Sequence, residues 1–285
     1  MALYIVVLLG IVQGAFMFLP VSSTAHLVLT QHWLIAGGAD LPAPDSAEMI
    51  LFDLVVHVGT LISIVVVFHR SLFRLIRDGF IGLARMTREL RPVPLTIRLA
   101  LLCALSVLAT GIIGITFKLF FEAVFARPAM IAGTLAFTGA LLWITDRLPP
   151  RPKGLKDIRA GTAIGIGVAQ GLSLIPGISR SGITIAASLL FGLKRRWAAE
   201  YSFVLASPTI LAATLVQFLE LQEAGGAVQL GWMDMLVGLV VAAVVGTFAL
   251  MLVVRLLYRA KLRIFSWYLW LLAILVAAGV LPLTH

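Results

Sequence analysis

The sequence predicts an all-α polytopic membrane protein with six transmembrane helices and two re-entrant helical hairpins. Three observations predict this fold class: the composition, the continuous apolar runs, and two apolar segments that each break at a proline followed by hydroxyl side chains. Of the 285 residues, 61% are hydrophobic and 12% are charged, and the mean hydropathy is +1.06. The run LVGLVVAAVVGTFALMLVV (236–254) does not alternate, which favours helices over the strands of a β-barrel.

The six crossings follow from apolar segments of about 20 residues, the length that spans a bilayer as a helix. They are expected near 49–68, 98–117, 128–145, 198–220, 233–254 and 264–282. The basic clusters at 69–98, 147–159, 194–196 and 255–263 are placed in the cytoplasm, because Lys and Arg concentrate there. The segments 37–48 and 221–234 contain acids but no Lys or Arg, so they are placed outside. These clusters account for the net charge of +9, and no nucleic-acid partner is expected.

Two segments, 2–35 and 160–193, do not fit as simple crossings. Segment 160–193 has basic groups on both sides, so it must enter and return on the same face of the membrane. In its turn, LSLIPGISRSGIT (172–184), Pro176 and Gly177 end one half-helix and Ser179 is well placed to cap the next. This segment is therefore predicted to be a re-entrant hairpin.

The first segment has a similar order of residues. Gln13-Gly14 is followed by Pro20 and hydroxyls, as Gln170-Gly171 is followed by Pro176 and hydroxyls. One hairpin plus three spans, repeated, predicts a single membrane domain with an inverted-topology repeat of 1–145 and 160–285. A site is then expected near the midplane, where the two broken helices meet.

Both broken helices are suited to an anion. The second half-helix of each hairpin begins at a hydroxyl cluster, so its unpaired N–H groups and positive dipole end face the site. Arg180 adds a planar fork of donors at membrane depth, which matches a phosphate. Structural alternatives stay open: Arg180 could bind backbone carbonyls, His26 could bridge helices, and Asp53 and His57 could pair on one helix face.

The motif PGISRSGIT (176–184) resembles the signature of the undecaprenyl pyrophosphate phosphatases, the bacitracin-resistance family. GIVQG (10–14), FLPVSSTAH (18–26) and FDLVVHVGTLISIVVVF (52–68) resemble further motifs of that family, and the likeness covers essentially the whole chain. The resemblance implies a hydrolase of the bacterial cytoplasmic membrane that converts undecaprenyl pyrophosphate to undecaprenyl phosphate, recycling the carrier for peptidoglycan synthesis. It also implies a site that opens to the periplasmic side and a requirement for Mg²⁺ or Ca²⁺. A homodimer is one possible assembly of the chain.

Carried onto this chain, the resemblance implies that Arg180 clamps the pyrophosphate and that Ser23 or His26 is the nucleophile or its base. Hydrogen bonds to the phosphate groups are expected from Ser22, Thr24, Ser179, Ser181 and Thr184. The family's N-terminal motif reads (E/Q)xxxE, and here Gln13 is followed by Met17 at the position of the second acid. Because a thioether is a poor ligand for a hard cation, the candidate metal ligands are Gln13 and a compensating Asp53.

Met17 keeps other functions open. Secondary transporters also combine inverted repeats with broken helices, so the chain could carry or flip a polyprenyl-phosphate lipid, or be a catalytically impaired phosphatase. Hydrolysis is favoured because the signature around Ser23, His26 and Arg180 is retained. A purely structural membrane subunit would not explain an arginine beside two facing helix ends.

Overall fold

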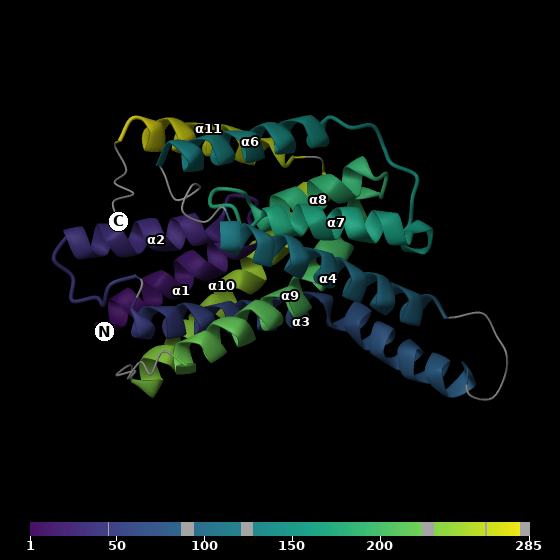
Figure 1. Ribbon diagram of the computed structural model, residues 1–285, viewed down its shortest axis with the longest axis horizontal. Coiled ribbons are helices and arrows are strands. Elements are labelled where there is room, and N and C mark those ends of the chain that lie inside the picture. Colours follow the sequence, from purple (N-terminus) through teal and green to yellow (C-terminus); the bar gives the residue numbers. More distant parts are fainter. Residues whose placement is uncertain (45, 87–93, 121–127, 224–230, 260, 280–285) are drawn as a thin grey trace.

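The computed structural model describes the chain except for residues 45, 87–93, 121–127, 224–230, 260 and 280–285. Its regular elements are α-helices and one short 3₁₀ helix, so the predicted all-α class is confirmed (Figure 1). In chain order the elements are α1 (Leu3–Phe18), α2 (Ser23–Ala36), α3 (Ala47–Met86), α4 (Leu95–Phe120), α6 (Pro128–Asp146), η1 (Leu155–Asp157), α7 (Ala160–Leu172), α8 (Arg180–Leu190), α9 (Arg195–Glu223), α10 (Trp232–Tyr258) and α11 (Arg263–Ala277).

Among the described residues, four helices are long and apolar enough to cross a membrane: α3, α4, α9 and α10. They coincide with the predicted crossings at 49–68, 98–117, 198–220 and 233–254. The other two predicted crossings, 128–145 and 264–282, coincide with α6 and α11, which belong with α1 and α7 to the shorter apolar helices. Residues 280–282 of the last crossing lie outside the described residues.

Helix α3 continues past its predicted crossing. It kinks at Phe68 (φ −104°, ψ 15°) and then runs on to Met86. Beyond the kink, His69, Arg70 and Arg74 are exposed. The basic segment predicted as a connection therefore begins as helix, because a helix satisfies its own backbone and need not end where apolar side chains end. In Figure 1 this second part of α3 projects away from the other helices beside the start of α4.

The chain that enters α7 and the chain that leaves α8 lie side by side. The Lys153 N–H donates to the Gly192 carbonyl at 3.0 Å, and the Lys194 N–H donates to the Lys153 carbonyl at 2.9 Å. The chain therefore enters α7 and leaves α8 at the same end of this helix pair. Met1, before α1, and Leu41, after α2, both pack against one hydrophobic cluster.

Small residues bring α1 and α7 close to helices of the opposite half. Helix α1 packs along α10, and α7 packs along α4. A Cβ atom on Gly14 would lie 2.7 Å from the Ala242 carbonyl oxygen, and one on Gly167 would lie 2.3 Å from the Ser106 carbonyl oxygen. GIVQG (10–14) and GVAQG (167–171) thus act as matching small-xxx-small faces.

Helices α6 and α11 lie side by side along one edge of the molecule (Figure 1). At one end of this pair the buried Asp146 carboxylate accepts hydrogen bonds from Arg195 Nη1 at 2.9 Å and from the Arg263 backbone N–H at 3.1 Å. The end of α6 and the starts of α9 and α11 are therefore joined at a single carboxylate.

Candidate active site

The two interrupted regions lie against each other. The turn between α1 and α2 contains Ser22 at φ 69°, a left-handed conformation that costs a non-glycine residue about 1–2 kcal/mol. The Ser181 hydroxyl of α8 donates to the Leu19 carbonyl of this turn at 3.4 Å. A Cβ atom on Gly182 would lie 3.4 Å from Pro20. The start of α8 therefore packs directly on the first break.

Ser179 caps α8, as the sequence predicts. Its hydroxyl oxygen accepts the Gly182 N–H at 3.2 Å, and Arg180 is the first residue of the helix. The N-terminal end of a helix carries a partial positive charge. The Arg180 guanidinium therefore adds its charge to an end that already favours anions.

The turn before α8 is held by α6. Gly177 adopts φ +89°, a conformation open to glycine. Thr134 donates to the Pro176 carbonyl at 2.5 Å, and Thr138 donates to the Gly177 carbonyl at 3.2 Å. Two threonines of α6 thus fix the position from which α8 and Arg180 start.

Three hydrogen-bond donors converge on the sulfur of Met17, whose side chain is buried. They are Gln13 Nε2 at 3.4 Å, Ser23 Oγ at 3.6 Å and Arg180 Nη2 at 3.6 Å. A thioether is a weak acceptor, so each donor keeps most of its capacity for a stronger one. Ser23 and Arg180, two of the three predicted catalytic residues, are brought together here.

His26, the third predicted catalytic residue, bonds elsewhere. Its Nδ1 lies 2.8 Å from the Ser22 carbonyl oxygen, and its Nε2 lies 2.5 Å from the Tyr268 hydroxyl of α11. The ring stacks between those of Phe16 and Tyr268, with centroids 4.1 Å and 5.6 Å away. Sequence analysis missed Tyr268, because one tyrosine among apolar residues forms no motif.

The predicted phosphate-binding hydroxyls differ in their surroundings. Thr184 is buried, donates to the Arg180 carbonyl at 2.8 Å and shares a 2.5 Å hydrogen bond with Ser202 of α9. Ser181 bonds to Ser179 at 3.3 Å, whereas the Thr24 side chain is exposed. Thr184 therefore ties α8 to α9 in the structure.

Asp53 and His57 do not pair through their side chains. His57 Nδ1 lies 2.7 Å from the Asp53 carbonyl oxygen. The Asp53 carboxylate instead accepts Gln31 Nε2 of α2, at 3.2 Å and 3.5 Å to its two oxygens. Helix α3 also packs against α1, the helix that carries Gln13 and Met17. The sequence analysis also missed Gln31, because a single amide in α2 belongs to no recognisable motif.

The residues around Met17 do not fit a resident Mg²⁺ or Ca²⁺, which take about six or more oxygen ligands. Gln13 Oε1 is buried without a hydrogen-bond partner and could serve as one ligand. Met17 offers only sulfur, Arg180 adds positive charge, and the Asp53 carboxylate bonds to Gln31. Within the described part of the chain, no group of three or more His, Cys, Asp or Glu side chains could hold a metal ion. A divalent cation at Gln13 and Asp53 stays a prediction.

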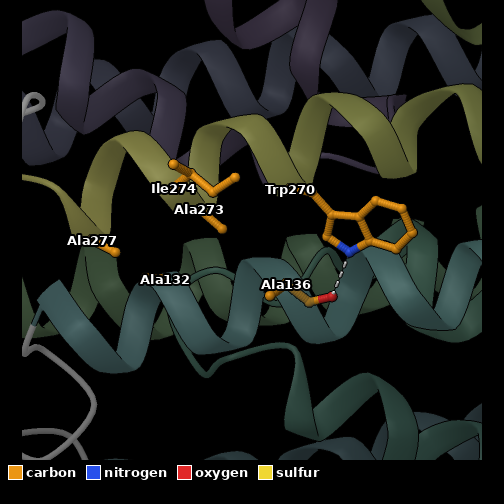
Figure 2. A pocket seen from close by; sticks show the side chains of 6 residues that line it. All are labelled: Ala132, Ala136, Trp270, Ala273, Ile274 and Ala277. Atoms are coloured by element: carbon orange, nitrogen blue, oxygen red, sulfur yellow. Dashed lines mark hydrogen bonds between the residues drawn. The ribbon is translucent and has the colours of Figure 1, made fainter.

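A separate apolar pocket of about 390 Å³ lies between α6 and α11. Figure 2 shows its lining and the hydrogen bond of 3.2 Å from Trp270 Nε1 to the Ala136 carbonyl. The lining residues are Ala132, Ala136, Trp270, Ala273, Ile274 and Ala277. No charged side chain lines this pocket, so it is not the phosphate site.

Four described helices that are long and apolar enough to cross a membrane indicate a membrane protein, and the donors that meet at Met17 are of the kind that bind an anion. Residues 6–275 match the model of the family described as Bacitracin resistance protein BacA. The chain is 59% identical over 283 residues to an undecaprenyl-diphosphatase of Halorhodospira halophila, covering 98% of both chains. It is 56% identical over 285 residues to an undecaprenyl-diphosphatase of Alkalilimnicola ehrlichii, covering 99% of this chain and 98% of the relative. The chain therefore belongs to the bacitracin resistance protein BacA family, as its motifs predict.

Proposed function

We propose that this chain is an undecaprenyl-diphosphatase, which hydrolyses undecaprenyl pyrophosphate to undecaprenyl phosphate and inorganic phosphate. The convergence of Arg180, Ser23 and Gln13 on the sulfur of Met17 carries the proposal. Two curated relatives of that name, 59% and 56% identical to this chain, support it. The reaction would return the lipid carrier to peptidoglycan synthesis and account for bacitracin resistance.

Binding of the pyrophosphate relies on groups that are already in place. A phosphate oxygen is a far stronger acceptor than a thioether, so it takes over the donors that now meet at Met17. Arg180 binds two oxygens with its planar fork, and the start of α8 adds its partial positive charge. Stabilising charge on the transferred phosphoryl oxygens is the main catalytic task in this chemistry.

Ser23 is the better placed nucleophile. Its hydroxyl shares the Met17 sulfur with Arg180, whereas both ring nitrogens of His26 have other partners. Attack by Ser23 Oγ on the terminal phosphorus forms one O–P bond and breaks the bridging P–O bond, which releases undecaprenyl phosphate. The Ser23 proton passes to His26 Nε2 by way of the Tyr268 hydroxyl, which gives its own hydrogen to that nitrogen and takes one in exchange. Water then releases inorganic phosphate from Ser23. No step is assigned to a divalent cation.

We further propose that α1–α2 and α7–α8 are re-entrant hairpins of an inverted repeat. The paired chain ends at Lys153 and Leu193 support a hairpin that returns to its own side. The Met1 amino group bonds to Asp234 at the start of α10 at 3.2 Å, which supports entry of α1 from the acidic end. The packing of α1 on α10 and of α7 on α4 has the exchanged pattern expected of two such repeats.

The acidic and basic ends of the helix bundle support an orientation of the protein in the membrane. The Asp146 junction brings Arg195 and Arg263 to one end of the bundle, and basic ends face the cytoplasm. The first hairpin would then enter from the periplasmic side of the inner membrane, and the site between the hairpins would open to that side.

The test is phosphate release from undecaprenyl pyrophosphate by the purified protein in detergent, with Mg²⁺, with Ca²⁺, and with chelator alone. We expect release by the parent protein and a fall on the order of 10²-fold or more in Ser23→Ala. Thr116→Ala removes an exposed hydroxyl that bonds to its own helix in α4 and should match the parent. Lipid binding by a folded parent that releases no phosphate under any of these conditions would contradict hydrolysis and favour transport.

A further inference from the structure

The contact between His26 and Tyr268 joins the site to a helix that otherwise stands apart from it. Helix α11 packs mainly on α6, and the two helices form one edge of the molecule (Figure 1). The Tyr268 hydroxyl nevertheless lies 2.5 Å from His26 Nε2, across 242 residues of sequence. This contact links His26 on α2 directly to α11.

The partner of the other ring nitrogen determines which atom donates. A carbonyl oxygen only accepts hydrogen bonds, so His26 Nδ1, at 2.8 Å from the Ser22 carbonyl, carries the ring hydrogen. In the neutral ring Nε2 then has the lone pair. The Tyr268 hydroxyl therefore donates to Nε2, the nitrogen that could accept a proton in the reaction.

Stacking restricts the same ring. The His26 ring lies at an interplanar angle of 17° to Phe16 and of 19° to Tyr268. Two stacked neighbours oppose rotation of the ring plane, and two hydrogen bonds fix its direction within that plane. Tyr268 contributes to both constraints, whereas a phenylalanine in its place would contribute only to the stacking.

We infer that Tyr268 is a positioning residue, which fixes the tautomer and direction of His26 and through whose hydroxyl a proton reaches Nε2. This inference rests on the proposed function for its consequence in turnover, but not for the contact itself. A hydroxyl can donate to neutral Nε2 and accept from protonated Nε2. Tyr268 therefore stays bonded to His26 in both protonation states, and it couples the placement of α11 to the chemistry on α2.

Chemical labelling tests the contact without reference to phosphatase activity. Diethyl pyrocarbonate attacks an unprotonated imidazole nitrogen, and peptide mapping by mass spectrometry reports the rate at His26 separately from the other histidines. We compare the parent with Tyr268→Phe, which keeps the ring and removes the hydroxyl, and with Tyr4→Phe, which removes an exposed hydroxyl of α1. We expect His26 to be labelled about fivefold faster in Tyr268→Phe and at the parent rate in Tyr4→Phe.

Steady-state hydrolysis of undecaprenyl pyrophosphate is the second measurement. In Tyr268→Phe we expect kcat to fall about tenfold, part of the contribution of a positioned base, with KM within about twofold because the phosphate-binding groups are untouched. Equal labelling rates at His26 in the parent and Tyr268→Phe would overturn the inference, whether or not the protein hydrolyses the lipid. Faster labelling with unchanged kcat would overturn the positioning role. An inactive parent with faster labelling in Tyr268→Phe would retain the contact and count against the proposed function instead.

Discussion

Arg180 and Arg195 begin neighbouring helices, and their surroundings differ in one respect. Arg195 Nη1 bonds to the Asp146 carboxylate at 2.9 Å, and its Nη2 bonds to the Asp146 carbonyl at 2.8 Å. Arg180 is half-buried and meets, among the described residues, the sulfur of Met17 at 3.6 Å. The fold supplies one guanidinium with a charged partner and the other with a weak neutral acceptor.

The difference in partners distinguishes an arginine that stabilises the fold from an arginine that is available to bind a ligand. A buried charge is costly unless it is paired, so Arg195 with Asp146 stabilises the junction of α6, α9 and α11. A guanidinium held beside a weak acceptor contributes little to that stability. It does keep a planar anion-binding group ready beside the Met17 sulfur, to which Ser23 and Gln13 also donate. We therefore propose that Arg195 stabilises the fold and that Arg180 binds pyrophosphate.

The largest expected effect on folding is at Asp146. Asp146→Asn leaves Arg195 without its charged partner and should lower the free energy of unfolding by about 3 kcal/mol, while turnover per folded molecule stays within about twofold of the parent. Glu200→Gln removes the partner of the exposed Arg196 and should cost only about 0.5 kcal/mol. Thermal unfolding in detergent measures both variants. Similar losses in the two variants would remove the distinction between a structural and an exposed ion pair.

Met17→Glu makes the surroundings of Arg180 resemble those of Arg195. A carboxylate at this position pairs with Arg180, so in the presence of chelator we expect KM for undecaprenyl pyrophosphate to rise about tenfold, the loss of one charge-assisted hydrogen bond. Added Mg²⁺ or Ca²⁺ should reverse this, because the new carboxylate can bind the cation.

Met17→Gln is the matched control for this change, since it has a similar size and no charge. It should keep a KM within about threefold of the parent and gain no dependence on a cation. If both variants behave alike with and without the cation, the charge at position 17 does not control Arg180.

The smallest expected effect is at the contact between the two helix breaks. Ser181→Ala removes the 3.4 Å hydrogen bond to the Leu19 carbonyl, which lets the start of α8 and Arg180 shift relative to Ser23. We expect KM to rise about threefold, the effect of one neutral hydrogen bond. Ser188→Ala removes a similar hydroxyl two turns further along α8, where it bonds within its own helix, and should leave KM unchanged. Steady-state phosphate release distinguishes the two variants.

The sequence predicted those features that local chemistry determines. Helix α7 ends at Leu172, a few residues before Pro176, and Ser179 caps α8. Capping acts over a few residues, so a local pattern can predict it. Arg180 was found because a charge at membrane depth is unusual in any sequence. The breaks between α1 and α2 and between α7 and α8, and the family, followed from such signals.

The remaining parts depend on distant pairings that no local pattern encodes. The bond from Tyr268 to His26 and the bond from Gln31 to Asp53 each join different helices. The pairing of Asp53 with His57 was left open by the sequence analysis. In the structure His57 Nδ1 lies 2.7 Å from the Asp53 carbonyl oxygen, and the Asp53 carboxylate accepts from Gln31. The continuation of α3 beyond Phe68 was missed because its apolar residues alternate with arginines, and the arginines were interpreted as a cytoplasmic connection.

The most direct test of the assignment is phosphate release from undecaprenyl pyrophosphate by the parent, Arg180→Lys and Arg195→Lys, compared at equal amounts of folded protein. Lysine keeps the charge and loses the planar fork. We expect kcat/KM to fall on the order of 10²–10³-fold in Arg180→Lys with an unchanged unfolding temperature. Arg195→Lys should lower the unfolding temperature and retain turnover. A loss of turnover in Arg195→Lys that equals the loss in Arg180→Lys, or full turnover in Arg180→Lys, would contradict the assignment of Arg180 to the pyrophosphate.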